Sequence, residues 1–278
     1  SVNIPNTIQA IRSLAFKGCS QLSVVKIPAS VTSIDDYAFE YCSELKFVTV
    51  PDSVKTIGRY AFGYCNSDLM IYCEAESRPA GYFVATGSAS GTWSGSAKRV
   101  WWGMTDYIID GDFIYGVKLD DTLAINLYTG NKTSVYIPFN VGDKTIKEIS
   151  PEAFSGKNKI KEIEMKFNIT KIGEKAFYGC TLLQNVELSS SLEFIGRLAF
   201  SGCSSLPYIV IPKSVTTIEF RAFYNENTDF VIYCEATSKP DGFYYDRFGP
   251  SSENWNGGYT YYFRPSWAFI DDVPTKVV

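Results

Sequence analysis

The side chains best suited to chemistry in this sequence are seven cysteines and thirty acidic residues, because histidine is absent. Without histidine, Ser-His-Asp catalysis, Cys-His catalysis and imidazole coordination of a metal are all excluded. The short paired cysteine spacings of a four-cysteine zinc site are also missing. We therefore expect no catalytic residue, no bound metal and no cofactor. Five cysteines recur in step with a 23-residue period, which favours buried, reduced thiols: Cys19, Cys42, Cys65, Cys180 and Cys203.

Three glutamates stand at alternating positions beside apolar residues. Glu162 and Glu164 flank Ile163, and Glu187 follows Val186 in the same phase. Because side chains of a strand alternate between its two faces, all three should lie on an outward, concave face. Glu164 and Glu187 would then be one strand spacing apart and repel each other. A basic partner or a weakly held calcium ion would relieve the repulsion, and a solvated polar face is the alternative.

Large apolar and aromatic side chains occupy the same outward phase. They are Phe47, Met70 and Tyr72 in the first half of the chain and Tyr208 and Tyr233 in the second. If the alternate residues form the core, these five side chains are exposed. Exposed aromatics that are contiguous on a rigid sheet are typical of a protein-binding surface, whereas singly exposed apolar residues are common and carry no meaning.

The element that positions these residues is a repeat. The pattern Ile-x-x-x-Ala-Phe occurs seven times, and within each of two groups the copies are 23 residues apart. A short strand in which apolar and outward-facing residues alternate precedes each copy, as at Val24 to Ile27. A small polar residue such as Ser30 follows this strand. A single 23-residue coil cannot bury its apolar side, but stacked coils can. The repeat therefore predicts stacked coils whose strands form a parallel sheet, with a short helical turn at each Ala-Phe pair.

The coil from Leu22 to Cys42 resembles the BspA-like (Treponema-type) class of leucine-rich repeats, which are bacterial surface proteins. The resemblance implies a β-rich α/β repeat: a right-handed leucine-rich-repeat solenoid with 23-residue rungs, a parallel concave sheet and short helical turns on the convex side. It indicates the fold specifically and the function weakly, because repeat scaffolds serve many partners.

The two groups of repeats belong to one duplication. Ile71 to Ala75 is matched by Ile232 to Ala236, at an offset of 161 residues. Tryptophan-containing or aromatic-rich segments follow each copy, and we expect residues 74–103 and 235–270 to close the arrays as caps. The predicted domains are residues 1–103, an array with its cap, and 104–278, a second array opened by a hairpin and closed by its own cap.

These features favour a non-enzymatic, extracellular or cell-surface binding module, similar to an adhesin. Its expected partner is a protein, from a host matrix or another cell surface, held on the concave sheet. The net charge of −4 argues against nucleic acid, and no apolar run is long enough to cross a membrane. The first strand begins in mid-coil, so we expect a signal and an anchor to lie outside this sequence. A spacer that presents another domain and a carbohydrate-binding protein using the cap tryptophans remain alternatives.

Overall fold

A computed structural model of the chain describes residues 2–82, 99–165, 167–224 and 230–236, and the backbone of 242–243, 261–263, 268–270 and 273–275. The chain divides by compactness into a first unit, residues 1–108 and 116–121, and a second unit, residues 109–115 and 122–278. The division passes through the neighbouring strands β9 (Met104–Asp110) and β10 (Phe113–Lys118). The predicted domains, 1–103 and 104–278, stay a prediction.

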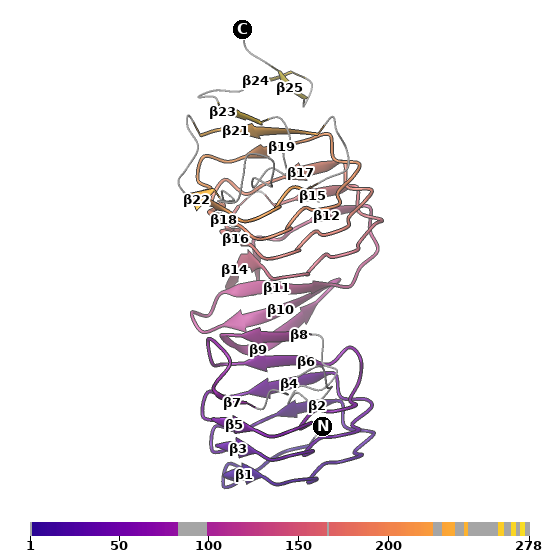
Figure 1. Cartoon of the computed structure of the whole chain (residues 1–278), viewed down its shortest axis with the longest axis vertical. Helices are drawn as coiled ribbons and strands as arrows, with labels where there is room; N and C mark the ends of the chain where they lie inside the picture. The colour runs from indigo at the N-terminus through magenta and orange to yellow at the C-terminus, as the bar shows by residue number, and fades with distance from the viewer. Residues whose placement is uncertain are drawn as a thin grey trace, which may run out of the picture. The chain divides into compact units, whose positions relative to one another are not determined.

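The first unit contains two parallel sheets, and each coil of the chain gives one strand to each sheet (Figure 1). One sheet consists, in spatial order, of β1 (Ala10–Ile11), β3 (Ser33–Ile34), β5 (Thr56–Ile57) and β7 (Gly81–Tyr82). The other consists of β2 (Val24–Lys26), β4 (Phe47–Val50), β6 (Met70–Cys73) and β8 (Arg99–Trp102). The sequence indicated only the second of these sheets, because two-residue strands carry no alternation to detect.

The second unit repeats this plan with a longer first sheet. That sheet runs from β9 through β10, β11 (Leu123–Tyr128), β14 (Lys144–Ile149), β16 (Lys171–Ile172), β18 (Phe194–Ile195) and β20 (Thr217–Ile218) to β22 (Gly242–Phe243), with β13 (Asn140–Val141) paired to β14. The other strands of the second unit form three separate sheets. One consists of β12 (Ser134–Tyr136), β15 (Glu162–Glu164) and β17 (Asn185–Glu187), and the next of β19 (Tyr208–Ile211), β21 (Val231–Cys234) and β23 (Tyr261–Phe263). The last is the pair β24 (Ala268–Ile270) and β25 (Val273–Thr275).

The segment before the second array forms β10, β11 and β12. β10 and β11 are consecutive strands and neighbours in the sheet. β12 pairs in parallel with β15, with Ser134 opposite Glu162, so it is already a strand of the array. β11 likewise pairs in parallel with β14.

Phenylalanine ladders fill the interior of both units. In the first unit, Phe39 and Phe62 stack with ring centroids 5.2 Å apart. In the second unit, Phe177 stacks on Phe154 and on Phe200, each at 4.9 Å. These rings are at most 1% exposed, as are the alanines that precede them. The predicted core is therefore confirmed for these coils, whereas Phe16 of the first repeat is only partly buried.

The short helical turns expected at the Ala-Phe pairs are absent, and no helix occurs in the residues that the structure describes. The backbone amide of Phe39 donates to the carbonyl of Ala61 in the next coil at 2.7 Å, instead of to a carbonyl one helical turn back. The residue before each alanine also has a positive φ, as at Tyr37 (59°) and Tyr60 (49°). A left-handed residue interrupts a right-handed helix, so these segments are turns bonded between coils.

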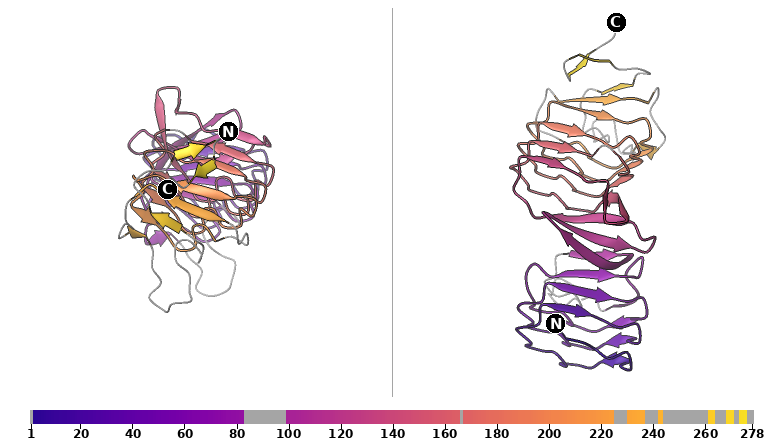
Figure 2. Two further views of the ribbon diagram at one scale, coloured as in Figure 1. Left: turned by 90° about the horizontal axis from the view of Figure 1, so that it is seen from above. Right: turned by 180° about the vertical axis from the view of Figure 1, so that it is seen from behind.

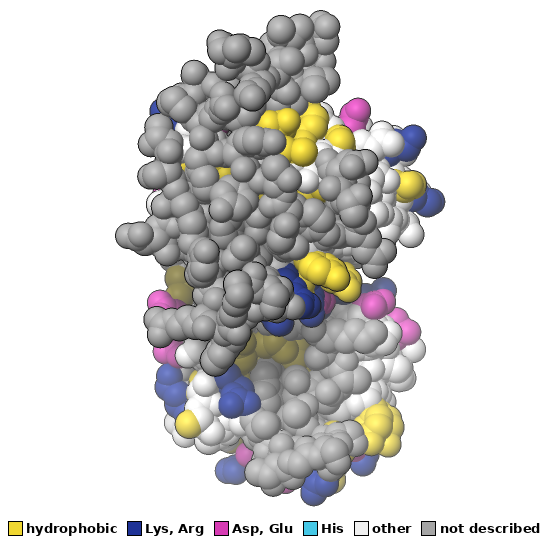
Figure 3. Space-filling model, turned by 45° about the horizontal axis from the view of Figure 1, so that its top comes forward, with side chains coloured by type: hydrophobic (Ala, Val, Ile, Leu, Met, Phe, Trp, Pro, Cys, Tyr) yellow, Lys and Arg dark blue, Asp and Glu magenta, His cyan; other side chains and the backbone are white. Residues whose placement is uncertain are grey.

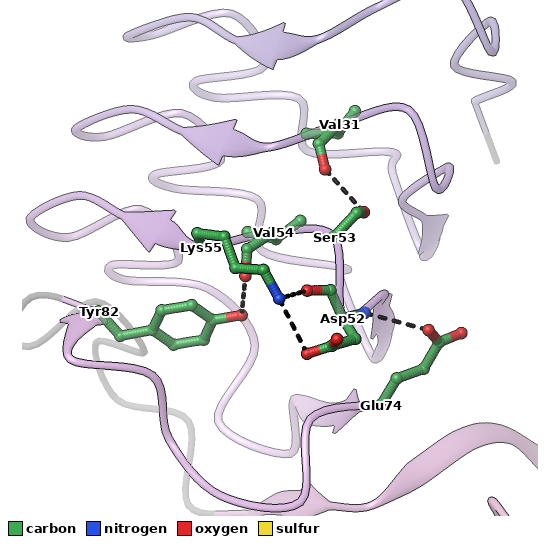
Figure 4. Close-up of polar contacts among 7 residues, drawn as sticks. All are labelled: Val31, Asp52, Ser53, Val54, Lys55, Glu74 and Tyr82. Carbon is green, nitrogen blue, oxygen red and sulfur yellow. Dashed lines mark hydrogen bonds and ion pairs between the residues drawn. The ribbon is translucent and has the colours of Figure 1, made fainter.

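Small polar residues after the strand bond to the preceding coil in three of the coils. The hydroxyl of Ser53 donates to the carbonyl of Val31 at 2.8 Å, and Ser30 and Ser214 make the same bond in their own coils. Figure 4 shows this corner, where the amide of Asp52 also donates to the carboxylate of Glu74 at 3.0 Å. These bonds satisfy carbonyls and amides that would otherwise be buried without partners.

The described chain is therefore a β-solenoid of parallel sheets. Figure 2 shows the successive coils of each unit from two further directions. No helix long and apolar enough to cross a membrane occurs among the described residues. Basic and acidic side chains are interspersed on the described surface visible in Figure 3, rather than separated by sign.

Candidate ligand-binding surface

The outer face of the second unit presents two rows of side chains. The central residues of β15, β17, β19 and β21 point inward and are at most 9% exposed: Ile163, Val186, Ile209 and Ile232. Their neighbours along each strand point outward. One row is Ser134, Glu162, Asn185, Tyr208 and Val231, and the other is Tyr136, Glu164, Glu187, Val210 and Tyr233. We call these two rows the second-array face.

The middle of the second-array face is acidic. Glu162 and Glu187 are exposed, and Glu164 is partly exposed. Glu164 lies directly opposite Glu187 in the neighbouring strand, which confirms the predicted stacking. Strands are about 4.8 Å apart, so the two carboxylates repel each other unless a cation lies between them. Within the described residues, no group of three or more acidic or cysteine side chains is arranged to hold a metal.

Aromatic side chains flank the acidic middle on both sides. Tyr208 and Tyr233 are partly exposed, and their rings meet edge to face at 6.1 Å. On the other side, the ring of Tyr136 is 55% exposed and lies opposite Glu164. Tyr136 was not predicted from the sequence, although its strand and its outward phase were both detectable once β12 was recognised as part of the array.

The corresponding face of the first unit is covered, which corrects the prediction for Phe47, Met70 and Tyr72. Met70 is 4% exposed, Tyr72 is fully buried, and Phe47 is only partly exposed. Tyr107 of β9 stacks on Phe47 at 4.3 Å and on Tyr72 at 5.3 Å. Tyr72 also donates a hydrogen bond to the sulfur of Met70 at 3.7 Å.

The cover is held by charge as well as by stacking. Gly103, with a φ of 70°, is the single residue between β8 and β9. On β9, the carboxylate of Asp106 lies 2.5 Å from the ammonium of Lys26 on β2. Burial, and secondarily the charge of Asp106, raises the pKa of Tyr107 above its usual value, so its phenol is neutral. The predicted exposure failed because strand alternation says which side chains point outward, but not what another segment lays over them.

A second exposed aromatic cluster lies at the turns of the first unit. Tyr41 stacks on Tyr64 at 5.0 Å, and Tyr37 stacks on Tyr60 at 5.8 Å. Tyr41 and Tyr64 have positive φ angles, at a position where glycine stands in several other repeats, such as Gly18 and Gly179. This replacement of glycine by tyrosine was the sequence signal that could have identified the cluster.

The tyrosine cluster interacts with neighbouring charges of its own unit. The ammonium of Lys17 lies 5.6 Å from the ring centroid of Tyr41 and 2.7 Å from the largely buried carboxylate of Glu40. The neighbouring Tyr60, followed by partial burial, raises the pKa of Tyr64. The cluster is therefore a structured surface, although its ring faces are largely occupied by one another and by Lys17.

The cysteines are mainly structural. All seven lie in the described part of the chain, and none is joined in a disulfide. Burial raises the pKa of Cys180 to about 12 and that of Cys203 well above its usual value. Their thiols donate to backbone carbonyls of the preceding coil, Cys180 to Phe154 and Cys203 to Phe177. The expectation of burial is wrong for Cys19, which is exposed because it belongs to the first coil, and Cys65 is partly exposed.

The carboxylates of the first unit's cavity are also structural. This cavity, of about 710 Å³, is lined by Asp35, Asp36 and Tyr82 among others. Asp35 pairs with Arg12 at 3.6 Å, and Asp36 accepts a hydrogen bond from the amide of Arg59 at 2.6 Å. The carboxylates of Asp35 and Asp36 therefore stabilise contacts between neighbouring coils.

The predicted caps fall largely outside the described residues, including Trp93 and Trp255. In the described part, Trp101 is 7% exposed and stacks on Tyr72 at 5.3 Å. Trp102 packs against the core of the first unit. Both tryptophans belong to β8, which extends the sheet by one strand.

Three solved structures of other proteins are similar to parts of this chain. The chain is similar to a leucine-rich repeat protein from Bacteroides capillosus, with 28% identity over 47% of this chain and 99% of that one, and a TM-score of 0.44. It is also similar to a leucine rich cell surface protein from Faecalibacterium prausnitzii, with 24% identity over 81% of this chain and 63% of that one, and a TM-score of 0.44. This chain therefore spans less than two thirds of the Faecalibacterium protein. A third similar structure is the pneumococcal vaccine antigen PcpA, with 18% identity over 82% of this chain and 67% of that one, and a TM-score of 0.40.

Comparison with curated protein sequences gives no match. A family model, described as the BspA type leucine rich repeat region, matches six copies in residues 1–78 and 128–246. These residues make up more than half of the sequence and include every repeat recognised above. The chain therefore belongs to the BspA-type leucine-rich repeat family.

Proposed function

We propose that this chain is a non-enzymatic, adhesin-like binding module that holds a protein ligand on the second-array face. One observation carries the proposal. The second-array face keeps an acidic middle flanked by the exposed Tyr136 and the partly exposed Tyr208 and Tyr233, whereas Met70 and Tyr72 on the same face of the first unit are buried and Tyr107 of β9 stacks on that face.

The composition of the second-array face suits a protein ligand. Tyrosine is enriched at the centres of protein interfaces, because it combines a large apolar ring with a hydroxyl and has few rotatable bonds. Glu162, Glu164 and Glu187 add a negative charge that attracts a basic flank of the ligand. The strands beneath are held by parallel pairing, β15 with β17 in one sheet and β19 with β21 in the next, so little ordering is needed when the ligand binds.

We further propose a location outside the cell or on its surface, with a ligand from a host matrix or another cell. This part rests on the resemblance to the BspA-like class of bacterial surface proteins. The lack of histidine and the structural roles of Asp35 and Asp36 support a module without catalytic activity.

The experiment is a binding assay of the full chain against immobilised extracellular-matrix proteins. Tyr208→Ala combined with Tyr233→Ala should abolish capture, because aromatic anchors typically contribute about 2 kcal/mol or more each. Glu164→Gln combined with Glu187→Gln should instead slow association at low salt, since exposed charges act mainly on the encounter.

Tyr41→Ala combined with Tyr64→Ala is the matched control, because these tyrosines are exposed but belong to the other unit. The site would instead be the tyrosine cluster if the Tyr41→Ala, Tyr64→Ala variant loses ligand capture while the Tyr208→Ala, Tyr233→Ala variant retains it. If nothing is captured, the spacer alternative is favoured. The carbohydrate alternative would require Trp93 or Trp255, because Trp101 is buried.

A further inference from the structure

Two cysteines of the first unit occupy the same position in neighbouring coils. Cys42 and Cys65 are 23 residues apart, and the tyrosines that directly precede them stack with ring centroids 5.0 Å apart. The backbone joins the two coils at the same turn, because the amide of Tyr41 donates to the carbonyl of Gly63 at 2.9 Å. A disulfide requires about 4.4–6.8 Å between the Cα atoms of its cysteines. The spacing of the coils therefore permits a disulfide between Cys42 and Cys65.

The thiol of Cys65 is directed at the coil that carries Cys42. It donates to the carbonyl of Phe39 at 3.1 Å, and the backbone amide of Cys42 donates to the same carbonyl at 3.3 Å. Both cysteines thus contact one oxygen atom. The hydrogen-bonding contact between the two thiols lowers the pKa of Cys42 below its usual value, although burial acts in the opposite direction. The contact therefore favours a thiolate within the pair.

The cysteines differ in their access to solvent. Cys65 is partly exposed, whereas Cys42 is fully buried. A small reagent in solution can therefore reach Cys65 but not Cys42. Cys180 and Cys203 of the second unit have the same 23-residue spacing, but each is at most 1% exposed. They form a matched pair with the same spacing and no access for the reagent.

We propose that a small-molecule disulfide oxidises Cys42 and Cys65 to an intramolecular disulfide bond. The thiolate of Cys65 attacks one sulfur of the reagent, which forms a mixed disulfide and releases one small thiol. The thiolate of Cys42 then attacks the sulfur of Cys65 and releases the second small thiol. The reagent thereby gains the two electrons and two protons that the two cysteines lose. Both cysteines belong to the first unit, whereas the second-array face belongs to the second.

The bond joins two coils that otherwise depend on hydrogen bonds and ring stacking. A cross-link stabilises a protein mainly because it restricts the unfolded chain. Since Tyr41 and Tyr64 directly precede the two cysteines, the bond also restricts the spacing of two exposed rings. The environment outside the cell, the location proposed above, favours the oxidised form.

The test is oxidation of the reduced full chain with oxidised glutathione at pH 8. Free thiols are then alkylated in denaturant, and tryptic peptides are identified by mass spectrometry. Trypsin cleaves between the two cysteines, for example at Lys46, so their peptides stay joined only through a disulfide. The peptide that links Cys42 to Cys65 should be roughly tenfold or more as abundant as one that links Cys180 to Cys203, and dithiothreitol should remove it.

Single replacements separate the two chemical steps. In the Cys42→Ser variant, the mixed disulfide between Cys65 and glutathione should accumulate, because no second thiol displaces it. In the Cys65→Ser variant, Cys42 should stay a free thiol, because the reagent does not reach it. Cys19→Ser is the control and should leave the linked peptide unchanged, although Cys19 itself is exposed. Circular dichroism establishes that each variant is folded.

Oxidation should also raise the urea concentration at which the chain unfolds, and the Cys65→Ser variant should show no such increase. The proposal is wrong if the folded chain forms no peptide linking Cys42 to Cys65, or if Cys42 is linked mainly to Cys19. It is equally wrong if Cys180 and Cys203 become linked as readily, because access through Cys65 would then have no part in the reaction.

Discussion

At the scale of single residues, the phenylalanine ladder carries much of the stability. Phe177 is fully buried between Phe154 and Phe200, and each neighbouring coil contributes one of those rings. Replacing it therefore opens a cavity that two coils share. Because the coils are held on both sides, they cannot collapse to fill the space.

Phe177→Ala should lower the free energy of unfolding by about 3–5 kcal/mol in chemical denaturation. Phe139→Ala is the control, because this ring is 50% exposed, and its effect should stay within about 0.5 kcal/mol. A loss below about 1 kcal/mol for Phe177→Ala would show that the assigned core is wrong.

The cysteines should differ in reactivity according to their coil. The thiolate is the reactive form, and burial disfavours it. Cys19 is exposed and should be alkylated rapidly in the native protein at pH 8, whereas Cys180, whose pKa is raised to about 12, should react only after denaturation. Mass spectrometry of peptides after timed labelling measures both rates, and equal rates would contradict the assigned burial.

The raised pKa of Cys180 also gives stability a pH dependence of defined sign. The folded state favours the neutral thiol, so this contribution is complete below the ordinary pKa of 9.0 and is lost as the pH rises towards about 12. The free energy of unfolding should therefore fall across this range, and less so in the Cys180→Ala variant.

At the scale of elements, β9 explains why the two sheet faces differ. Its position over β4 and β6 rests mainly on the ring of Tyr107. The ion pair between Lys26 and Asp106 involves side chains that are 60% and 41% exposed, so water screens it.

Tyr107→Ala should therefore destabilise the protein by roughly 1–3 kcal/mol, because it uncovers Phe47 and Tyr72. Asp106→Asn should cost no more than about 1 kcal/mol. Both are measured by urea denaturation, with Tyr136→Ala as the control for an exposed ring. If Tyr107→Ala costs no more than this control, the ring does not hold β9 in place.

How much of this could be predicted from the sequence also depends on the element. Strand alternation correctly placed Glu162, Glu164 and Glu187 outward, because that property is local to each strand. Strand alternation could not predict that Met70 and Tyr72 are buried, because their burial depends on β9, a segment that follows the last repeat of the first group. The turns at the Ala-Phe pairs were mistaken for helix because their hydrogen bonds run to the next coil, which no local pattern reports.

At the scale of the whole molecule, the duplication gives two arrays of the same design whose outer faces can have different roles. One copy uses its outer face to hold part of its own chain, and that face contributes to stability. The other copy keeps the same aromatic positions with the opposite charge, and we assign it to the ligand. On this proposal, one scaffold serves two purposes through changes at outward positions, while the inward positions remain those of the repeat.

The most direct test of the proposed site is hydroxyl-radical footprinting of the full chain with and without a captured matrix protein. Side-chain oxidation, read by mass spectrometry, reports which rings the ligand covers. Bound ligand should protect Tyr136, Tyr208 and Tyr233 and leave Tyr41 and Tyr64 as reactive as before. Protection of Tyr41 and Tyr64, with Tyr208 and Tyr233 unchanged, would contradict the assignment of the ligand to the second-array face.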